Sequence, residues 1–186
     1  MVNEKTKISV PGFLANGISV GIKDGQKKDI GLIYSTVPAK VAAVFTKNAF
    51  KAAPVLIDME RVKKGVAQAI VTNSGCANAA TGKEGYQDAL AVSAALNSHL
   101  KIKEEHILVC STGVIGKRLP VKKIESGMGK LVKGLNESGI PDAEEAMMTT
   151  DKYPKMAIRR GIVGAKDVTI CGIAKGAGII EPNMAT

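Results

Sequence analysis

One apolar run constrains the fold of this chain more than any other stretch. Residues 66–75, VAQAIVTNSG, are almost continuously apolar and end in polar residues and glycine. Such a run is typical of a β-strand that is buried on both faces and then leaves the sheet as a loop.

Further strands are predicted on both sides of this run. They are short, rich in β-branched residues and separated by Gly, Asp or Pro turns, as strands in small sheets commonly are. Before the run they cover 17–23, 29–35 and 40–46, and after it they cover 106–116, 156–164 and 167–175. A compact chain with strands at both ends would bring these strands together, and we expect them to be neighbours.

Two helices are indicated between the strands by apolar residues at helical spacing. The first covers 89–100 and follows two expected breaks, at Gly82 and Gly85. The second covers 121–135, and Pro120 lies at its first turn, where a missing N–H costs nothing.

A third and shorter helix is expected at 141–148, PDAEEAMM. Strands, helices and strands again within one compact length imply a layered α/β fold. Hydrophobic residues make up 45% of the chain and charged residues 23%, which is enough apolar material for a core. The 186 residues suggest one domain, or one half of a larger one.

The formal net charge of +9 raises the question of nucleic-acid binding. The basic residues are scattered in short groups, and three Phe, three Tyr and no Trp give little aromatic surface on which bases could stack. A solvated basic surface is the favoured interpretation. Two others stay open, namely a more acidic partner chain and anionic substrates that are steered inward by the field.

The cysteines and the first residues bear on location and metal binding. Cys76, Cys110 and Cys171 are far apart and none has metal-ligand spacing to another, so we expect no structural metal. Unpaired thiols fit a reducing compartment. The start, MVNEKTKISV, has no apolar run that could serve as a signal peptide or membrane span, so we expect a cytoplasmic protein.

The catalytic chemistry has to work without a histidine base. Only His99 and His106 are present, and both are expected to be structural, which argues against a Ser-His-Asp triad. A threonine at the start of a chain carries its own base, the α-amino group, but it arises only when the preceding bond is broken. The segment KGAGIIEPNMAT (175–186) reads like the interior of a domain, and cleavage before Thr186 would create such a nucleophile. On residue types alone, a boundary that falls on threonine by chance stays open.

An oxyanion hole is also needed, and the turn CSTG (110–113) is a candidate. Thr112 offers a hydroxyl and an N–H, and Gly113 offers an N–H without a side chain in the way. An ordinary Ser-Thr-Gly turn is the alternative that the residues alone favour.

Four segments together resemble one enzyme family. KGAGIIEPNMAT resembles the self-cleavage segment of the ornithine acetyltransferases, also called glutamate N-acetyltransferases, which act in arginine biosynthesis and split into α and β chains before a threonine. The other three are the loop VTNSGCANAATG (71–82), the oxyanion segment CSTGVIGKRLP (110–120) and the substrate-contacting stretch AMMTTDKYPK (146–155). The resemblance spans essentially the whole chain, with small departures at Cys76, where we expect Asn, and at Ala80, where we expect Cys.

The resemblance implies roles for the residues that match the family's motifs. Cleavage would fall between Ala185 and Thr186, so that Thr186 becomes the nucleophile and the first residue of the second chain. Thr112 and Gly113 would form the oxyanion hole.

Substrate binding is implied for Thr149 and Lys175, together with Thr186. The Lys175 ammonium is suited to pair with the carboxylate of an acetylated amino acid. The plain alternatives are a surface lysine at a strand end and a residue at a helix C-terminus.

The function implied is transfer of acetyl from N2-acetylornithine to glutamate by a ping-pong route through an acetyl-threonine. The fold would be an α/β arrangement of layered sheets flanked by helices. Residues 1–186 would form a single α-chain domain, which the β chain completes, in a heterotetramer of two α and two β chains. No metal or bound cofactor would be needed, and acetyl-CoA is left open as a second acetyl donor.

Two rival functions stay open. A self-processing aminopeptidase would share the cleavage and the fold but hydrolyse its acyl-enzyme; the threonine, where such peptidases are expected to have serine, argues against it. A non-enzymatic basic domain that binds nucleic acid is the other rival, and its affinity would fall steeply with salt.

Overall fold

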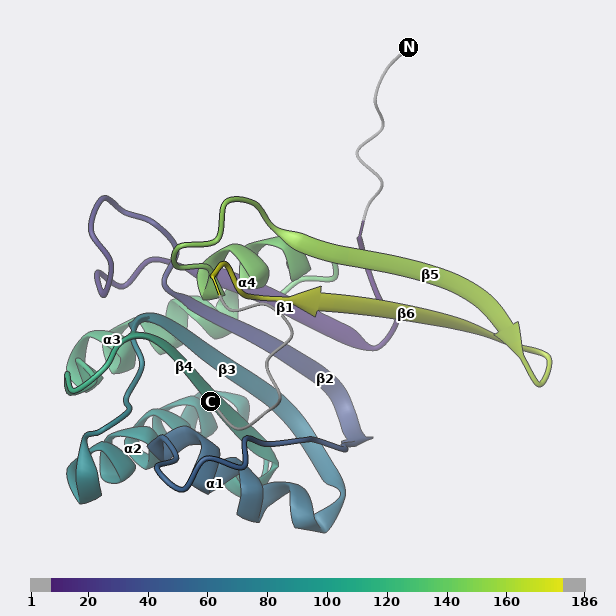
Figure 1. Cartoon of the computed structure of the whole chain (residues 1–186). Helices are drawn as coiled ribbons and strands as arrows, with labels where there is room; N and C mark the ends of the chain where they lie inside the picture. Colours follow the sequence, from purple (N-terminus) through teal and green to yellow (C-terminus); the bar gives the residue numbers. More distant parts are fainter. Residues whose placement is uncertain (1–7, 179–186) are drawn as a thin grey trace.

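A computed structural model describes residues 8–178 of the chain and places six strands in two sheets (Figure 1). The larger sheet has the order β1-β2-β3-β4. Its strands are β1 (Phe13–Ile18), β2 (Ile30–Lys40), β3 (Val66–Cys76) and β4 (Ile107–Val114). Pairing is antiparallel from β1 to β3 and parallel between β3 and β4. The apolar run at 66–75 is therefore a strand, as predicted, and it has a neighbouring strand at each edge.

Two helices cover one face of this sheet. They are α2 (Gly82–Leu100) and α3 (Val121–Lys133), which pack against each other and against the strands. The main core lies between them and the sheet, and its fully buried side chains include Leu32, Leu96, Ile107, Met128 and Leu131. No helix in the described part of the chain is long and apolar enough to cross a membrane.

The opposite face is covered by α4 (Ile140–Met147), which packs unusually close to the strands. Two glycines make this approach possible. A Cβ at Gly17 would lie 2.0 Å from the Asp142 carbonyl oxygen, and a Cβ at Gly31 would lie 2.8 Å from the Ala143 carbonyl oxygen. The sheet thus has helices on both faces, which confirms the layered α/β fold.

The helix α1 (Ala53–Arg61) closes the open edge of β4. The Asp58 carboxylate accepts a hydrogen bond from the Val109 N–H at 3.0 Å, and the Arg61 guanidinium donates to the Ile107 carbonyl at 2.5 Å. Burial raises the pKa of Asp58 to about 7, although the Val109 bond and the Arg61 charge act in the other direction. These side chains satisfy backbone groups that an edge strand would otherwise leave unpaired.

The strands β5 (Lys155–Val163) and β6 (Lys166–Ala174) form a separate two-stranded hairpin that extends away from the rest of the molecule (Figure 1). The expectation that strands from both ends lie together is wrong as far as sheet pairing is concerned. In the described part of the chain they meet through an apolar cluster instead, in which Met156 and Ile173 at the base of the hairpin lie with Val10, just before β1, and with Ile33 of β2. Towards its tip, Ile162 is 74% exposed.

Three local predictions fail. Residues 19–28 form a loop rather than a continued strand, and 41–48 run outside the sheet, so the predicted strands at 17–23 and 40–46 are mostly wrong. The helix α1 and the short 3-10 turns at Val62–Lys64 and Glu104–His106 were not expected. The helix α2 begins at Gly82 and contains Gly85, so neither glycine is a break before it; at Gly85 a Cβ would lie 1.8 Å from the Thr81 hydroxyl oxygen.

Candidate active site

A buried aspartate shapes the first wall of the candidate site, the loop at 19–28. Asp29 directly precedes β2 and is completely buried. Its carboxylate accepts backbone N–H bonds from Val20 at 2.7 Å, Ile22 at 2.6 Å and Lys23 at 3.1 Å. A short carboxylate side chain that bonds nearby backbone N–H groups holds a loop in place of a strand. The loop is thereby turned towards the end of α4, where the Lys23 ammonium donates to the Met148 carbonyl at 3.0 Å.

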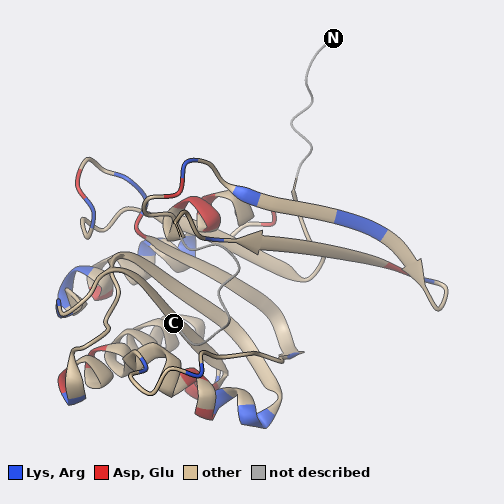
Figure 2. Cartoon of the chain, viewed as in Figure 1, with Lys and Arg blue, Asp and Glu red and all other residues tan. Residues whose placement is uncertain are grey.

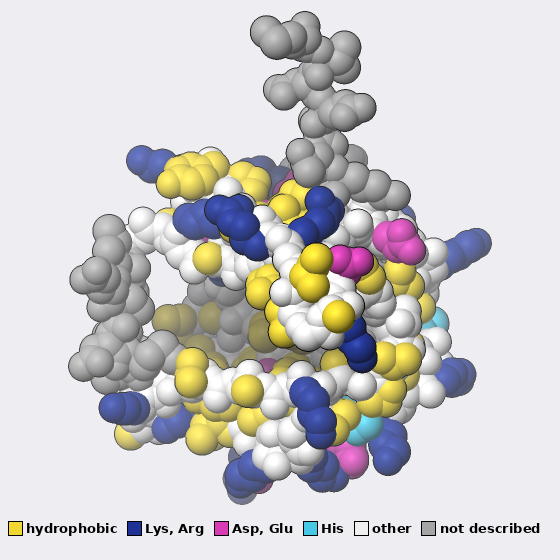
Figure 3. Space-filling model, turned by 90° about the vertical axis from the view of Figure 1, so that its right-hand side faces the viewer, with side chains coloured by type: hydrophobic (Ala, Val, Ile, Leu, Met, Phe, Trp, Pro, Cys, Tyr) yellow, Lys and Arg dark blue, Asp and Glu magenta, His cyan; other side chains and the backbone are white. Residues whose placement is uncertain are grey.

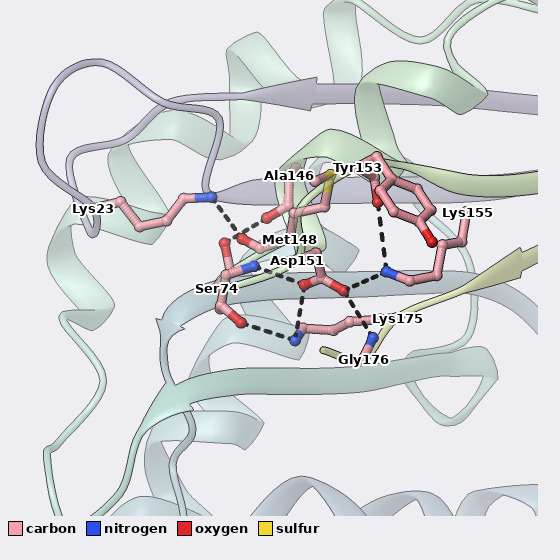
Figure 4. Close-up of polar contacts among 10 residues, drawn as sticks. Lys23, Ser74, Ala146, Met148, Asp151, Tyr153, Lys155, Lys175 and Gly176 are labelled. Atoms are coloured by element: carbon pink, nitrogen blue, oxygen red, sulfur yellow. Dashed lines mark hydrogen bonds and ion pairs between the residues drawn. The ribbon is translucent and has the colours of Figure 1, made fainter. Parts of the chain in front are cut away.

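A second buried aspartate organises the opposite wall, where the chain leaves α4 and where β6 ends (Figure 4). The Asp151 side chain is 1% exposed. It accepts the Thr149 N–H at 3.1 Å and the Gly176 N–H at 2.8 Å, and it pairs with the ammonium groups of Lys155 at 2.9 Å and Lys175 at 3.4 Å. Burial alone would raise the pKa of this carboxyl, but the N–H bonds and the two lysines together hold it well below its ordinary value.

Two of the three expected substrate-binding residues, Thr149 and Lys175, meet in this wall, and the third, Thr186, lies outside the described residues. The Lys175 ammonium donates to the Thr149 hydroxyl at 2.9 Å. Thr149 is exposed and lines a cavity, and the Lys175 side chain is 25% exposed. The structure therefore brings both residues to one place from elements 26 positions apart.

The ends of β3 and β4 form the floor. Ser74 pairs with Thr112 and Gly75 with Gly113 in the parallel register. Gly113 has φ +134°, and a Cβ on it would lie 2.4 Å from the Gly75 carbonyl carbon, so only glycine fits here. The Ser74 hydroxyl donates to the Ala146 carbonyl at 2.5 Å and ties the floor to α4 (Figure 4). Thr112 and Gly113 thus lie where β4 ends, next to a glycine that lines the cavity.

The walls and floor enclose a cavity of about 670 Å³ with a positive lining. Its charged lining residues are Lys23, Lys27, Lys28, Lys117, Asp24, Glu145 and Asp151. Lys28 is already paired with Glu145 and Asp142, both at 2.7 Å. The remaining lysines leave the cavity suited to an anionic molecule.

Sequence reasoning missed Lys23, Asp29 and the central place of Asp151. Asp151 stands two residues after Thr149 in the stretch TTD, which is a signal that could have found it. No sequence signal pointed to Lys23 or Asp29, because the patterns at 17–23 and 29–35 predict strands. Ala185 and Thr186, the predicted cleavage pair, lie outside the described residues.

Cys76, where the resemblance led us to expect Asn, is buried below this region. Its Sγ lies 3.1 Å from the Lys117 carbonyl oxygen and so joins the end of β3 to the segment after β4. The Cys76 thiol therefore serves as a hydrogen-bond donor to the backbone, and Cys76 is not among the residues that line the cavity.

The chain resembles known proteins over nearly its whole length. The arginine biosynthesis bifunctional protein ArgJ of Caldanaerobacter subterraneus subsp. tengcongensis is 51% identical over 181 residues, which cover 97% of this chain and 45% of that protein. The protein of the same name from Geobacter sulfurreducens is 47% identical over 179 residues, which cover 96% of this chain and 46% of that protein. The chain thus spans just under half the length of these curated relatives.

Two solved structures have the same fold. The crystal structure of arginine biosynthesis bifunctional protein ArgJ from Bacillus halodurans superposes with a TM-score of 0.89 at 40% identity, over 95% of this chain and 94% of that chain. Ornithine acetyltransferase from Mycobacterium tuberculosis, solved in complex with ornithine, gives a TM-score of 0.83 at 38% identity, over 94% and 93%. The family pattern itself matches residues 14–186, and the chain therefore belongs to the ArgJ family.

Proposed function

We propose that the full-length protein is an ornithine acetyltransferase, or glutamate N-acetyltransferase, of arginine biosynthesis. It transfers acetyl from N2-acetylornithine to glutamate by a ping-pong route. The observation that carries the proposal is the Thr149–Lys175 pair beside a lysine-lined cavity, in a chain similar to proteins named for arginine biosynthesis.

The nucleophile arises by self-cleavage at Ala185–Thr186. The Thr186 hydroxyl oxygen attacks the Ala185 carbonyl, and the acyl group moves from nitrogen to oxygen. Water then hydrolyses the ester and leaves Thr186 with a free α-amino group. The ordinary pKa of such an amine, about 7.7–8.0, keeps a useful fraction neutral and able to act as a base.

The same oxygen carries the acetyl group during turnover. Its attack on the acetyl carbonyl gives a tetrahedral oxyanion, the C–N bond breaks, and ornithine leaves with the proton that the amine had taken. The glutamate amine then attacks the acetyl ester and regenerates the hydroxyl. Thr112 and Gly113 are suited to stabilise the oxyanion, since they end β4 beside Gly75, which lines the cavity.

Thr149 and Lys175 orient the substrate. The Lys175 ammonium can pair with a substrate carboxylate, and Asp151 fixes its position from below. The reaction needs no metal or bound cofactor. Acetyl-CoA would be a second acetyl donor if the protein is bifunctional like the relatives named above.

The partner would be the protein's own β chain, with residues 1–186 as the α-chain domain and two chains of each kind in a heterotetramer. Support comes from the hairpin β5–β6, because an isolated two-stranded hairpin is marginally stable. Beside it lies an apolar groove of about 320 Å³, lined by Val10, Phe13, Ile33, Ile140 and Ile173 among others. Figure 3 looks onto this side and shows a hollow with hydrophobic side chains on its walls.

The two rival functions are less well supported. Basic side chains are spread over separate elements instead of forming one face (Figure 2), which disfavours nucleic-acid binding. Hydrolysis in place of transfer would need water to outcompete glutamate in a cavity with a positive lining.

Three unpaired cysteines fit the expected cytoplasmic location.

Processing and kinetics test the proposal. Full-length Thr186→Ala should remain one polypeptide on a denaturing gel, whereas Thr186→Ser, which keeps a hydroxyl, should still divide. Initial rates of the processed protein at several fixed glutamate concentrations should give parallel double-reciprocal lines. Two chains from the alanine variant, or intersecting lines, would contradict the covalent route.

A further inference from the structure

Lys23 faces the Thr149–Lys175 pair from the other wall of the cavity. Its ammonium donates to the Met148 carbonyl at 3.0 Å, and Lys175 donates to the hydroxyl of the next residue, Thr149, at 2.9 Å (Figure 4). Two ammonium groups from distant elements are thus held at consecutive residues. The site carries a second cation that the proposed chemistry does not use.

The two ammonium groups differ in how far their charge is neutralised. Lys175 and Lys155 share the single carboxylate of Asp151. The Lys23 ammonium donates its hydrogen bond to an uncharged carbonyl, while the nearby Asp29 carboxylate is occupied by backbone N–H groups. Burial lowers the pKa of Lys23, and the charges on Asp29 and Glu145 oppose this effect. The two lysines around Asp151 therefore carry one more charge than its carboxylate supplies, and the Lys23 ammonium has an uncharged hydrogen-bond partner.

Two cationic groups on facing walls suit a ligand with two carboxylates. Glutamate has two, about 5 Å apart in the extended form, whereas ornithine has one carboxylate and a side-chain ammonium. We propose that Lys23 binds the side-chain carboxylate of the acceptor and makes the acetyl-enzyme select a dicarboxylate, while Lys175 holds the α-carboxylate. The inference rests on the proposed acetyl transfer and assigns a specificity-determining residue to it.

The geometry of the loop favours this role. The Lys23 backbone is held by Asp29, and its side-chain stem passes close to Gly75, where a Cβ would lie 3.1 Å from the Lys23 Cγ. The ammonium is therefore presented at one place, with little freedom left to lose when a carboxylate binds. Replacing the neutral carbonyl partner by a carboxylate would also strengthen its hydrogen bond.

The inference is tested by measuring which acceptor, glutamate or ornithine, the acetyl-enzyme prefers. In full-length processed protein, the acetyl-enzyme can be discharged by glutamate or by labelled ornithine, the latter as exchange into N2-acetylornithine. For Lys23→Met, kcat/KM for glutamate should fall by about tenfold or more, as expected when a charged hydrogen-bond partner is lost. The value for ornithine should stay the same or rise, because an opposing positive charge is gone. Lys23→Arg should keep the preference for glutamate.

The chain offers a matched control in Lys123. Its ammonium donates to the Gly21 carbonyl of the same loop at 2.8 Å, but Lys123 does not line the cavity. Lys123→Met should leave the ratio of the two acceptors unchanged. An equal loss for both acceptors in Lys23→Met would make Lys23 a structural support of the loop and overturn the inference. Absence of any acetyl transfer by the wild-type protein would instead contradict the proposed function.

Discussion

Thr149 and Lys175 meet through a 2.9 Å hydrogen bond between the lysine ammonium and the threonine hydroxyl, although 26 positions separate them in the chain. One follows α4 and the other follows β6. Both are held by the buried carboxylate of Asp151, which accepts the Thr149 N–H and pairs with Lys175. The hairpin β5–β6 therefore begins and ends next to the same carboxylate, and this closure places Lys175 beside Thr149, which lines the cavity.

Lys175→Met should weaken substrate binding. If the ammonium pairs with a carboxylate, its loss should lower kcat/KM for N2-acetylornithine by roughly 10- to 100-fold, mainly through KM. Lys166→Met, at the exposed start of β6, is the control and should have little effect. Steady-state kinetics of the full-length protein would show the difference, and an unchanged KM would mean that Lys175 does not bind substrate.

Asp151→Asn should destabilise the protein by about 1–3 kcal/mol, because two lysines lose a shared charge partner in a buried place. The pKa of Asp151 is lower in the folded state, so its contribution is present above the unfolded value of about 3.9 and is lost as the pH falls below it. Thermal unfolding at pH 7 and pH 3 would measure this. Asp167→Asn, on the exposed part of β6, should change little, and equal effects of both variants would argue against the network.

Thr112→Ala should slow catalysis while leaving substrate affinity largely intact, because an oxyanion donor acts mainly in the transition state. Loss of one such donor costs about 10²–10³ in kcat. Thr72→Ala serves as control, since its hydroxyl lies 3.4 Å from the Gly31 carbonyl and away from the β4 end. A raised KM with normal kcat would make Thr112 a binding residue or part of an ordinary turn.

Asp58 should make stability depend on pH in the opposite direction to Asp151. Its pKa rises to about 7 in the folded state from about 3.9 in the unfolded state, so the folded state binds the extra proton between these values. Wild-type stability should therefore fall as the pH rises from 4 through 7, relative to Asp58→Asn, which cannot titrate. Urea unfolding at several pH values tests this, and parallel stability curves for the two proteins would refute it.

The helices α2, α3 and α4 and the two strands of the hairpin could be predicted from the sequence because their patterns are local, whereas the separation of the hairpin from the main sheet could not. The spacing of Val92 and Leu96, or of Ile124 and Met128, directs these side chains into one core, and the structure buries all four. The helix α1 was not predicted because it is stabilised by tertiary contacts at the β4 edge. One of these joins Asp58 to Val109, which lies 51 positions later in the chain.

The cavity could be predicted only in part. Thr149 and Lys175 were expected from motifs, but Lys23 depends on Asp29, whose carboxylate turns a strand-like segment into a loop. That effect arises from three backbone bonds that no periodicity reveals. The close approach at Gly113 is also tertiary, since it depends on Gly75 of the neighbouring strand.

The central claim is that acetyl passes through Thr186, and the mass of the second chain tests it most directly. Processed full-length protein should be incubated with N2-acetylornithine alone, analysed by intact mass spectrometry, and analysed again after glutamate is added. The chain that begins with Thr186 should gain the mass of one acetyl group and lose it to glutamate as N-acetylglutamate. Acetyl transfer without an acetylated second chain, or rapid release of acetate that does not respond to glutamate, would contradict the account.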